Sequence, residues 1–528
     1  MSQSAGFIHA YTDMLSVEAG QEIGLCVSTT ADSYSVKIAR VGAKTETVWQ
    51  EDDICGNEFP VPATAFATGC DWPVTLRVRT RSSWRSGYYS VILMTDDGVA
   101  RGAASFVVRS AQPGRTARIL LQRTTNTDSA YNRWGGSSLY NGPVEPAHRV
   151  SFDRPFSGHS KYGDELFVVP GEFAADLDDR RVPDVLREAM AAKGATLSAF
   201  HFVESVRMGY YWYVIDAGAL YGLRQTPSGV QVYDSFTKWA SCWERWEHPF
   251  VCWAEVAGYS IDYAVNGDLE FRPEVLEGYR LVLSVGHDEY WSRPMRDHLE
   301  RYIERGGNVA FFSGNALFWQ VRSEAGGRQL VCWKESMRDP RYQEGEHDVL
   351  STLWCHRLIG RPENHLTGVS FAYGGYHRFF DQHWDAASGY IVHRPDHWVF
   401  EGSGLEKGSL LGENDRVIGY ECDGCHLKWR DGVPVAVGDD GTPSSFDVLA
   451  TASASLSDAD GSFAMVNDAL FGQDCEKSLP REGAAVLGTY TRGGQVFTTG
   501  CTEWSNGLHG RDLQVERITR NVLDRLSS

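Results

Sequence analysis

Short apolar runs typical of β-strands alternate with helical segments through much of the chain after residue 117. Residues 250–265 have the pattern of a helix, a glycine and a strand, and residues 272–285 repeat this order. A further amphipathic helix ends at a glycine pair before a strand at 309–313. Because a strand–helix–strand unit builds a parallel sheet with the helix on one face, this order predicts a doubly wound α/β domain.

The first part of the chain has a different pattern. Residues 1–111 contain short β-branched or aromatic runs, separated by stretches of Gly, Asp, Asn and Ser, and this spacing is typical of an immunoglobulin-like β-sandwich. A chain of 528 residues exceeds the size at which a single core stops growing, so we expect a second domain at 112–528. Within it, an aromatic-rich stretch around 204–256 is interpreted as an insert with its own core, as one wall of a substrate cavity, or as both.

Charge and targeting signals narrow the class of protein. A net charge of −19 argues against binding to nucleic acid or to an anionic membrane, which requires a basic face. The N-terminal residues lack the basic and apolar regions of a signal peptide, and no run of about 18 apolar residues is present, so we expect a cytoplasmic protein. Of the eleven cysteines, Cys422 and Cys425 form a lone C-x-x-C without a second ligand pair, which favours a structural role over a zinc site.

Charged side chains directly follow the predicted strand 281–285. These are His287, Asp288 and Glu289, and such a cluster is costly to bury unless it faces water, a partner charge or a metal. Asn315 directly follows the next predicted strand. Because ligands of open parallel sheets bind at the carboxyl ends of strands, we expect His287, Glu289 and Asn315 to lie on one rim. Asp288 is expected to point away from that rim, toward a backbone amide or the surface, because adjacent residues diverge after a strand.

Two tyrosines follow the first predicted strand of the same domain. Tyr131 and Tyr140 lie in a segment rich in Gly and Ser, which we predict to be a loop reaching the same crevice. Carboxylate and phenolate oxygens are hard ligands, suited to a highly charged ion such as ferric iron. The chain has neither a G-x-S-x-G elbow at a strand–helix turn nor an H-E-x-x-H motif, so a serine triad and a zincin site are disfavoured.

The same segments carry a resemblance to a known family. The strings "AYN…GGSSLY", "GHDEYW", "GNALFW" and "GYECDG" resemble the large (beta) subunit of N,N-dimethylformamidase, and the resemblance spans most of residues 115–528. It implies a glutamine-amidotransferase-like α/β fold. It also implies one iron ion held by two tyrosines and one glutamate, and hydrolysis of the C–N bond of small amides.

Matched motif by motif, the resemblance assigns six site residues in this chain. The implied iron ligands are Tyr131, Tyr140 and Glu289. The implied catalytic residues are His287, Asn315 and Glu421, the last of them in the "GYE" segment. Under this interpretation the metal polarises the carbonyl and activates water, the second glutamate acts as general base, and the histidine and asparagine hydrogen-bond the developing oxyanion.

Two other functions are compatible with the sequence. The first is a binding or scaffold protein that keeps the amidotransferase-like shell without chemistry. The second is a carbohydrate-active hydrolase that uses Glu289 and Glu421 as paired carboxylates. The expected partners are a small amide substrate, further copies of the chain in a homo-oligomer and, by the resemblance, a small subunit.

Overall fold

The computed structural model describes most of the chain. The described residues are 6–98, 100–140, 146–156, 167–169, 211–213, 223–225, 231–233, 241–377, 386–458, 460–473 and 475–528. Much of the stretch 204–256, which the sequence analysis interprets as an aromatic insert, lies outside these residues, so its role stays a prediction.

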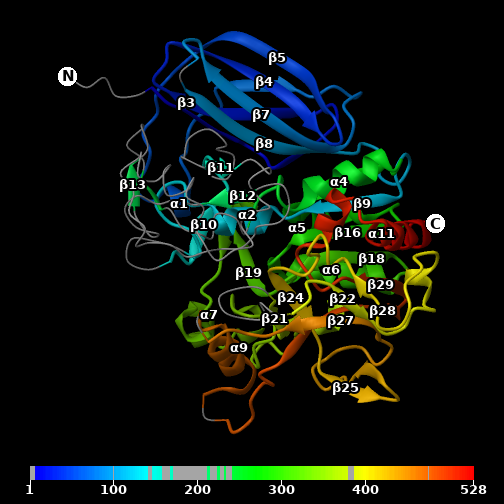
Figure 1. The fold of residues 1–528 in the computed structure, drawn as a ribbon. Helices are drawn as coiled ribbons and strands as arrows, with labels where there is room; N and C mark the ends of the chain where they lie inside the picture. The colour runs from blue at the N-terminus through cyan, green and yellow to red at the C-terminus, as the bar shows by residue number, and fades with distance from the viewer. Residues whose placement is uncertain are drawn as a thin grey trace.

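The N-terminal part of the chain forms two sheets that share one hydrophobic core, drawn in blue in Figure 1. One sheet has the order β1-β3-β6, with β1 Ile8–Thr12, β3 Glu22–Thr29 and β6 Leu76–Arg79. The other has the order β2-β8-β7-β4-β5, with β2 Ser16–Glu18, β8 Arg101–Arg109, β7 Gly87–Thr95, β4 Ser33–Val41 and β5 Thr45–Cys55. Alternate side chains, such as Val36 and Ile38 of β4, point into the common core, as the twofold repeat of a strand requires. We refer to residues 6–109 as the β-sandwich.

A nine-stranded sheet forms the centre of the rest of the molecule. Its order is β15-β9-β16-β18-β29-β28-β27-β22-β23. The bounds are β15 Ile261–Val265, β9 Ile119–Arg123, β16 Leu281–His287, β18 Asn308–Gly314, β29 Gly494–Thr498, β28 Gly483–Arg492, β27 Asp447–Ala454, β22 Tyr390–Val392 and β23 Leu410–Leu411.

The sheet is parallel in one half and antiparallel in the other. The strands from β15 to β29 pair in parallel, and those from β29 to β23 pair antiparallel. The predicted doubly wound parallel sheet therefore describes only the first half. The direction changes because β28 and β29 are joined through Gly493 alone, at a φ of 75°, and so short a connection can join only antiparallel strands.

Helices cover both faces of the parallel half. Leu283 of β16 belongs to a core with α4 Glu247–Val256, α10 Trp504–His509 and α11 Leu513–Leu526. The neighbouring Val282 belongs to a second core, with α5 Asn266–Phe271 and α6 Arg293–Glu304. The chain is thus of the α/β class, as the alternation of strands and helices predicts. Among the described helices, none combines the length and the apolar character needed to cross a membrane.

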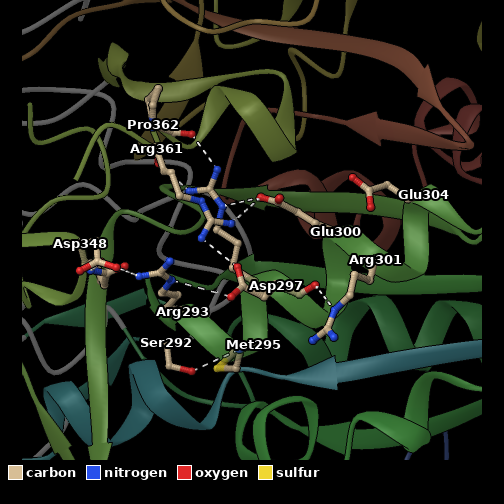
Figure 2. Close-up of polar contacts among 12 residues, drawn as sticks. Ser292, Arg293, Met295, Asp297, Glu300, Arg301, Glu304, Asp348, Arg361 and Pro362 are labelled. Carbon is tan, nitrogen blue, oxygen red and sulfur yellow. Dashed lines mark hydrogen bonds and ion pairs between the residues drawn. The ribbon is translucent and has the colours of Figure 1, made fainter.

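Helix α6 is held at its start and along its outer face (Figure 2). Ser292 caps it, because its hydroxyl accepts the N–H of Met295. On the exposed face the guanidinium of Arg361 donates to Asp297 at 2.8 Å and to Glu300 at 3.2 Å. These contacts fix the helix that begins four residues after the polar segment at 287–289.

The β-sandwich rests on α4 and α5 (Figure 1). Arg40 of β4 pairs with Glu255 of α4 at 2.6 Å. Ser16 of β2 donates a hydrogen bond to Asp268 of α5 at 2.7 Å. Both contacts are largely closed to solvent, so the two parts of the molecule meet through buried polar groups as well as apolar ones.

The described residues also include smaller sheets and short helices. The remaining strands outside the site are β10 Arg149–Ser151, β11 Phe167–Val169, β12 Tyr211–Tyr213, β13 Leu223–Gln225, β14 Gln231–Tyr233, β20 Gln329–Val331, β25 Leu427–Arg430 and β26 Val433–Ala436. The remaining α-helices outside the site are α1 Ala65–Thr68, α7 Pro340–Gln343, α8 Asn364–Thr367 and α9 Ser462–Phe471.

Candidate active site

The carboxyl ends of β9 and β16 bring the predicted site residues to one place. Tyr131 is the last residue of α2 Thr125–Tyr131, the helix that follows β9, whereas the sequence predicted a loop there. Tyr140 lies in the loop that follows this helix. His287 is the last residue of β16, which is two residues longer than predicted, and Glu289 lies between β16 and β17 Tyr290–Ser292.

Two phenols converge on one carboxylate. The hydroxyl of Tyr131 donates to Oε2 of Glu289 at 2.9 Å. The hydroxyl of Tyr140 donates to Oε1 of the same carboxylate. The two rings stack, with centroids 4.3 Å apart and an angle of 12° between their planes. Two phenols, one from α2 and one from the loop after it, therefore meet the same carboxylate.

One imidazole nitrogen approaches two carboxylates in the same place. Nε2 of His287 is 2.9 Å from Oε2 of Glu421 and 3.4 Å from Oε2 of Glu289. Glu421 begins β24 Glu421–Gly424, which pairs with β21 Ser370–Tyr376. All three side chains are buried, so this contact is made away from bulk water. The pairing of Glu421 with a histidine was not predicted from sequence, because it joins segments more than a hundred residues apart.

Asn315 lies in the turn after β18, beside the end of β16. The parallel register pairs His287 with Gly314, so Asn315 directly follows the partner of the histidine. Its backbone has a φ of 48°, in the left-handed region. Within the described residues, its buried Oδ1 atom has no hydrogen-bond partner, so this atom does not hydrogen-bond the tyrosines or glutamates of the site.

The sequence analysis missed two further residues that touch the site. Trp319, the first residue of β19 Trp319–Glu324, donates its indole N–H to Oε1 of Glu289 at 2.8 Å. Nζ of Lys334 lies 3.1 Å from the centroid of the Tyr140 ring and 4.7 Å from that of Trp319. Trp319 lies within the "GNALFW" string, but no local pattern distinguishes Lys334 from a surface lysine, since only the fold places its ammonium over aromatic rings.

Burial disfavours negative charge on the carboxyl group of Glu289 and on the phenols of Tyr131 and Tyr140. It raises the pKa of Glu289, an effect that His287 opposes and Glu421 reinforces. Burial and the neighbouring Glu289 raise the pKa values of Tyr131 and Tyr140 well above the usual range of a phenol. A cation placed among these groups would have the opposite effect and stabilise their anionic forms.

The donor set fits a hard metal ion. Among the described residues, no group of three or more His, Cys, Asp or Glu side chains is arranged to hold a metal. Phenolate and carboxylate oxygens suit a hard cation.

Asp288 points away from this cluster, into the interior. Its carboxylate accepts hydrogen bonds from Gln122 at 2.6 Å and from Ser284 at 2.9 Å. The expected direction is correct, but the expected partner is wrong, since the carboxylate meets side chains rather than a backbone amide or solvent. The reason is that β9 runs beside β16, with Gln122 in register with Ser284.

Comparisons with known proteins agree with the family resemblance. The model of a family described as N,N-dimethylformamidase beta subunit-like, C-terminal, matches residues 35–518. The N,N-dimethylformamidase beta subunit of Paracoccus aminophilus is 24% identical over 319 residues, which are 53% of this chain and 36% of that protein. The N,N-dimethylformamidase beta subunit of an Alcaligenes species is 25% identical over 313 residues, which are 53% of this chain and 37% of that protein. The matches thus span little more than a third of the length of each relative.

Proposed function

Because the chain belongs to the N,N-dimethylformamidase beta subunit-like family, we propose that it hydrolyses the C–N bond of a small amide with one bound iron ion. The observation that carries this proposal is the convergence of Tyr131 and Tyr140 on the carboxylate of Glu289. The three groups come from α2, from the loop after it and from the segment between β16 and β17.

Tyr131, Tyr140 and Glu289 would hold the ion. When bound, it supplies a Lewis acid, which polarises a carbonyl and lowers the pKa of a coordinated water. Lys334 and Trp319 support the ligands, since an ammonium over the Tyr140 ring favours the phenolate and the indole N–H orients Glu289.

Glu421, His287 and Asn315 would handle protons and the developing charge. As general base, Glu421 takes a proton from the attacking water and passes it to the leaving nitrogen. The imidazole of His287, 2.9 Å from Glu421, orients that carboxylate and hydrogen-bonds the reacting oxygen. The side-chain amide of Asn315 donates to the oxyanion, an interaction that strengthens as charge develops there.

The two other functions fit the geometry less well. A glycosidase uses two carboxyl groups, and it gives no role to the two phenols that donate to Glu289. A scaffold protein has no need for a buried cluster of two glutamates, a histidine and two phenols, whose desolvation costs free energy.

Domain structure and assembly form part of the same proposal. We assign residues 1–111 to an immunoglobulin-like domain and residues 112–528 to a glutamine-amidotransferase-like domain, supported by the shared core of the two sheets and by the helices on both faces of the parallel strands. Self-association and a small partner subunit are also proposed, since the relatives carry the name of a beta subunit.

Metal analysis with a visible spectrum and a screen of small amides tests the proposed function. We expect about one iron ion per chain and an absorption band of tyrosinate bound to Fe(III). Glu289→Ala should lose both iron and turnover, whereas His287→Ala should keep iron and lose turnover by roughly 10²-fold or more. Amide hydrolysis at full rate by protein that carries no transition metal would contradict the metal-dependent mechanism.

A further inference from the structure

Asp423 binds the turn that carries Asn315. Its Oδ1 atom accepts the backbone N–H of Asn315 at 2.9 Å, and its Oδ2 atom accepts that of Ala316 at 3.2 Å. The side chain is 1% exposed, so these two hydrogen bonds are shielded from water. Asp423 lies on β24 two residues after Glu421, and the twofold repeat of a strand puts both carboxylates on the same side.

The turn needs such support because its backbone is strained. Asn315 and Leu317 have φ values of 48° and 60°, in the left-handed region that non-glycine residues rarely adopt. The N–H of Leu317 donates to the carbonyl of Asp288, which fixes only the far end of the turn. The strands also approach closely here, since a Cβ atom on Gly314 would lie 2.6 Å from the carbonyl oxygen of Glu421.

We propose that Asp423 is a positioning residue, which holds the turn 315–317 so that the side chain of Asn315 faces the substrate. The inference rests on the proposed function and adds to it a residue that does not touch the reacting atoms. Through β24, Glu421 contacts His287 while Asp423 binds the turn of Asn315. A single strand therefore sets the position of the general base relative to the oxyanion donor.

The first test is a double-mutant cycle measured as kcat/KM. We expect Asp423→Asn to lower kcat/KM by roughly 10²-fold, because small displacements of a positioned group have effects of this size. Asn315→Gly should lower it by roughly 10²- to 10³-fold. Glycine is chosen because it adopts the left-handed conformation without strain. In the double variant, Asp423→Asn should add little to the loss caused by Asn315→Gly. Fully multiplicative losses, or wild-type kcat/KM in Asp423→Asn, would overturn the inference.

Asp440→Asn is the matched control for stability. The Asp440 carboxylate is also buried and accepts two backbone N–H groups, that of His426 at 2.6 Å and that of Thr442 at 3.0 Å. We expect a fall in thermal midpoint similar to that of Asp423→Asn, with kcat/KM unchanged within about threefold. An equal loss of turnover in both variants would show that destabilisation alone explains the effect, and would overturn the inference.

Amide hydrogen exchange gives a measurement that does not depend on turnover. The amide protons of Asn315 and Ala316 should be protected in the wild type and should exchange at least about tenfold faster in Asp423→Asn, with iron content unchanged. Unprotected amides in the wild type would overturn the inference, even if Asp423→Asn does not fold. A wild type that hydrolyses no amide but protects both protons refutes the proposed function alone, and leaves Asp423 as the residue that holds the turn.

Discussion

The individual residues of the site depend on one another for their chemistry. Glu289 accepts hydrogen bonds from two phenols and one indole, and the imidazole of His287 lies within 3.4 Å of it. Removing a single hydroxyl therefore changes the surroundings of the whole cluster, whereas the same change elsewhere in the core removes only one polar atom.

Tyr140→Phe tests this difference directly. We expect this variant to lose most of its iron and its visible absorption band, because a phenyl ring cannot ligate a metal. Tyr263→Phe is the control, since its hydroxyl is buried with no hydrogen-bond partner among the described residues, and it should keep its iron. Metal analysis and circular dichroism of both proteins decide the outcome. Wild-type iron in Tyr140→Phe would exclude this phenol as a ligand.

Among the elements, the end of β16 is tightly constrained at a glycine. Gly286 precedes the site histidine and has a φ of 80°. A Cβ atom on it would lie 2.3 Å from the Cβ atom of Trp246, which approaches from just before α4. Glycine is required here for two separate reasons, the backbone conformation and the space.

Gly286→Ala should therefore lower the free energy of unfolding more than alanine does at a glycine that has a left-handed φ but free space around it. Gly326→Ala is the matched control, since Gly326 has a φ of 64° but a Cβ atom on it would meet nothing within 4 Å. We expect Gly326→Ala to lower the free energy of unfolding by about 1–3 kcal/mol and Gly286→Ala to lower it by several kcal/mol, because of the added clash with Trp246. Equal losses of unfolding free energy in the two variants, measured by denaturant unfolding, would show that Trp246 and α4 move aside without cost.

At the scale of the whole molecule, the β-sandwich and the α/β part meet through buried charge. Burial would raise the pKa of Glu255, but the hydrogen bonds from Arg40 and from the backbone N–H of Ala43 outweigh it, so the pKa lies below its usual value. A lowered pKa means that the carboxylate stabilises the fold above the unfolded pKa, about 4.3, and that this stability disappears as the pH falls through the lower folded pKa.

Arg40→Met should weaken this interface in a pH-dependent way. At pH 7 the variant is expected to lose about 1–3 kcal/mol of stability, because Glu255 stays partly buried without its cation. The difference from wild type should shrink as the pH falls below about 4, where Glu255 becomes protonated. Arg77→Met removes an exposed pair with Glu22 of the same sandwich, and should change the thermal midpoint far less. A difference at pH 7 that persists unchanged at pH 3 would contradict the assignment.

Much of the fold follows from local patterns in the sequence. The strands β16 and β18, the helix α6 between them and the strands β3, β4, β6, β7 and β8 of the β-sandwich were predicted, because hydrophobic periodicity records which face of each element is buried. The strands β1, β2 and β5 were not predicted. The antiparallel half of the large sheet was not predicted, since periodicity shows that a strand is present but not which neighbour it pairs with.

The difference between what the sequence determined and what only the tertiary structure decided is clearest at the site. The sequence by itself determined which segments carry polar residues at strand ends, among them His287, Glu289 and Asn315, because these positions follow from local structure. Only the tertiary structure decided that Glu421 and Glu289 approach the same imidazole nitrogen and that Lys334 lies over Tyr140. The physical reason is that contacts between distant segments depend on how whole layers pack, and the residues on either side of a contact carry no local record of it.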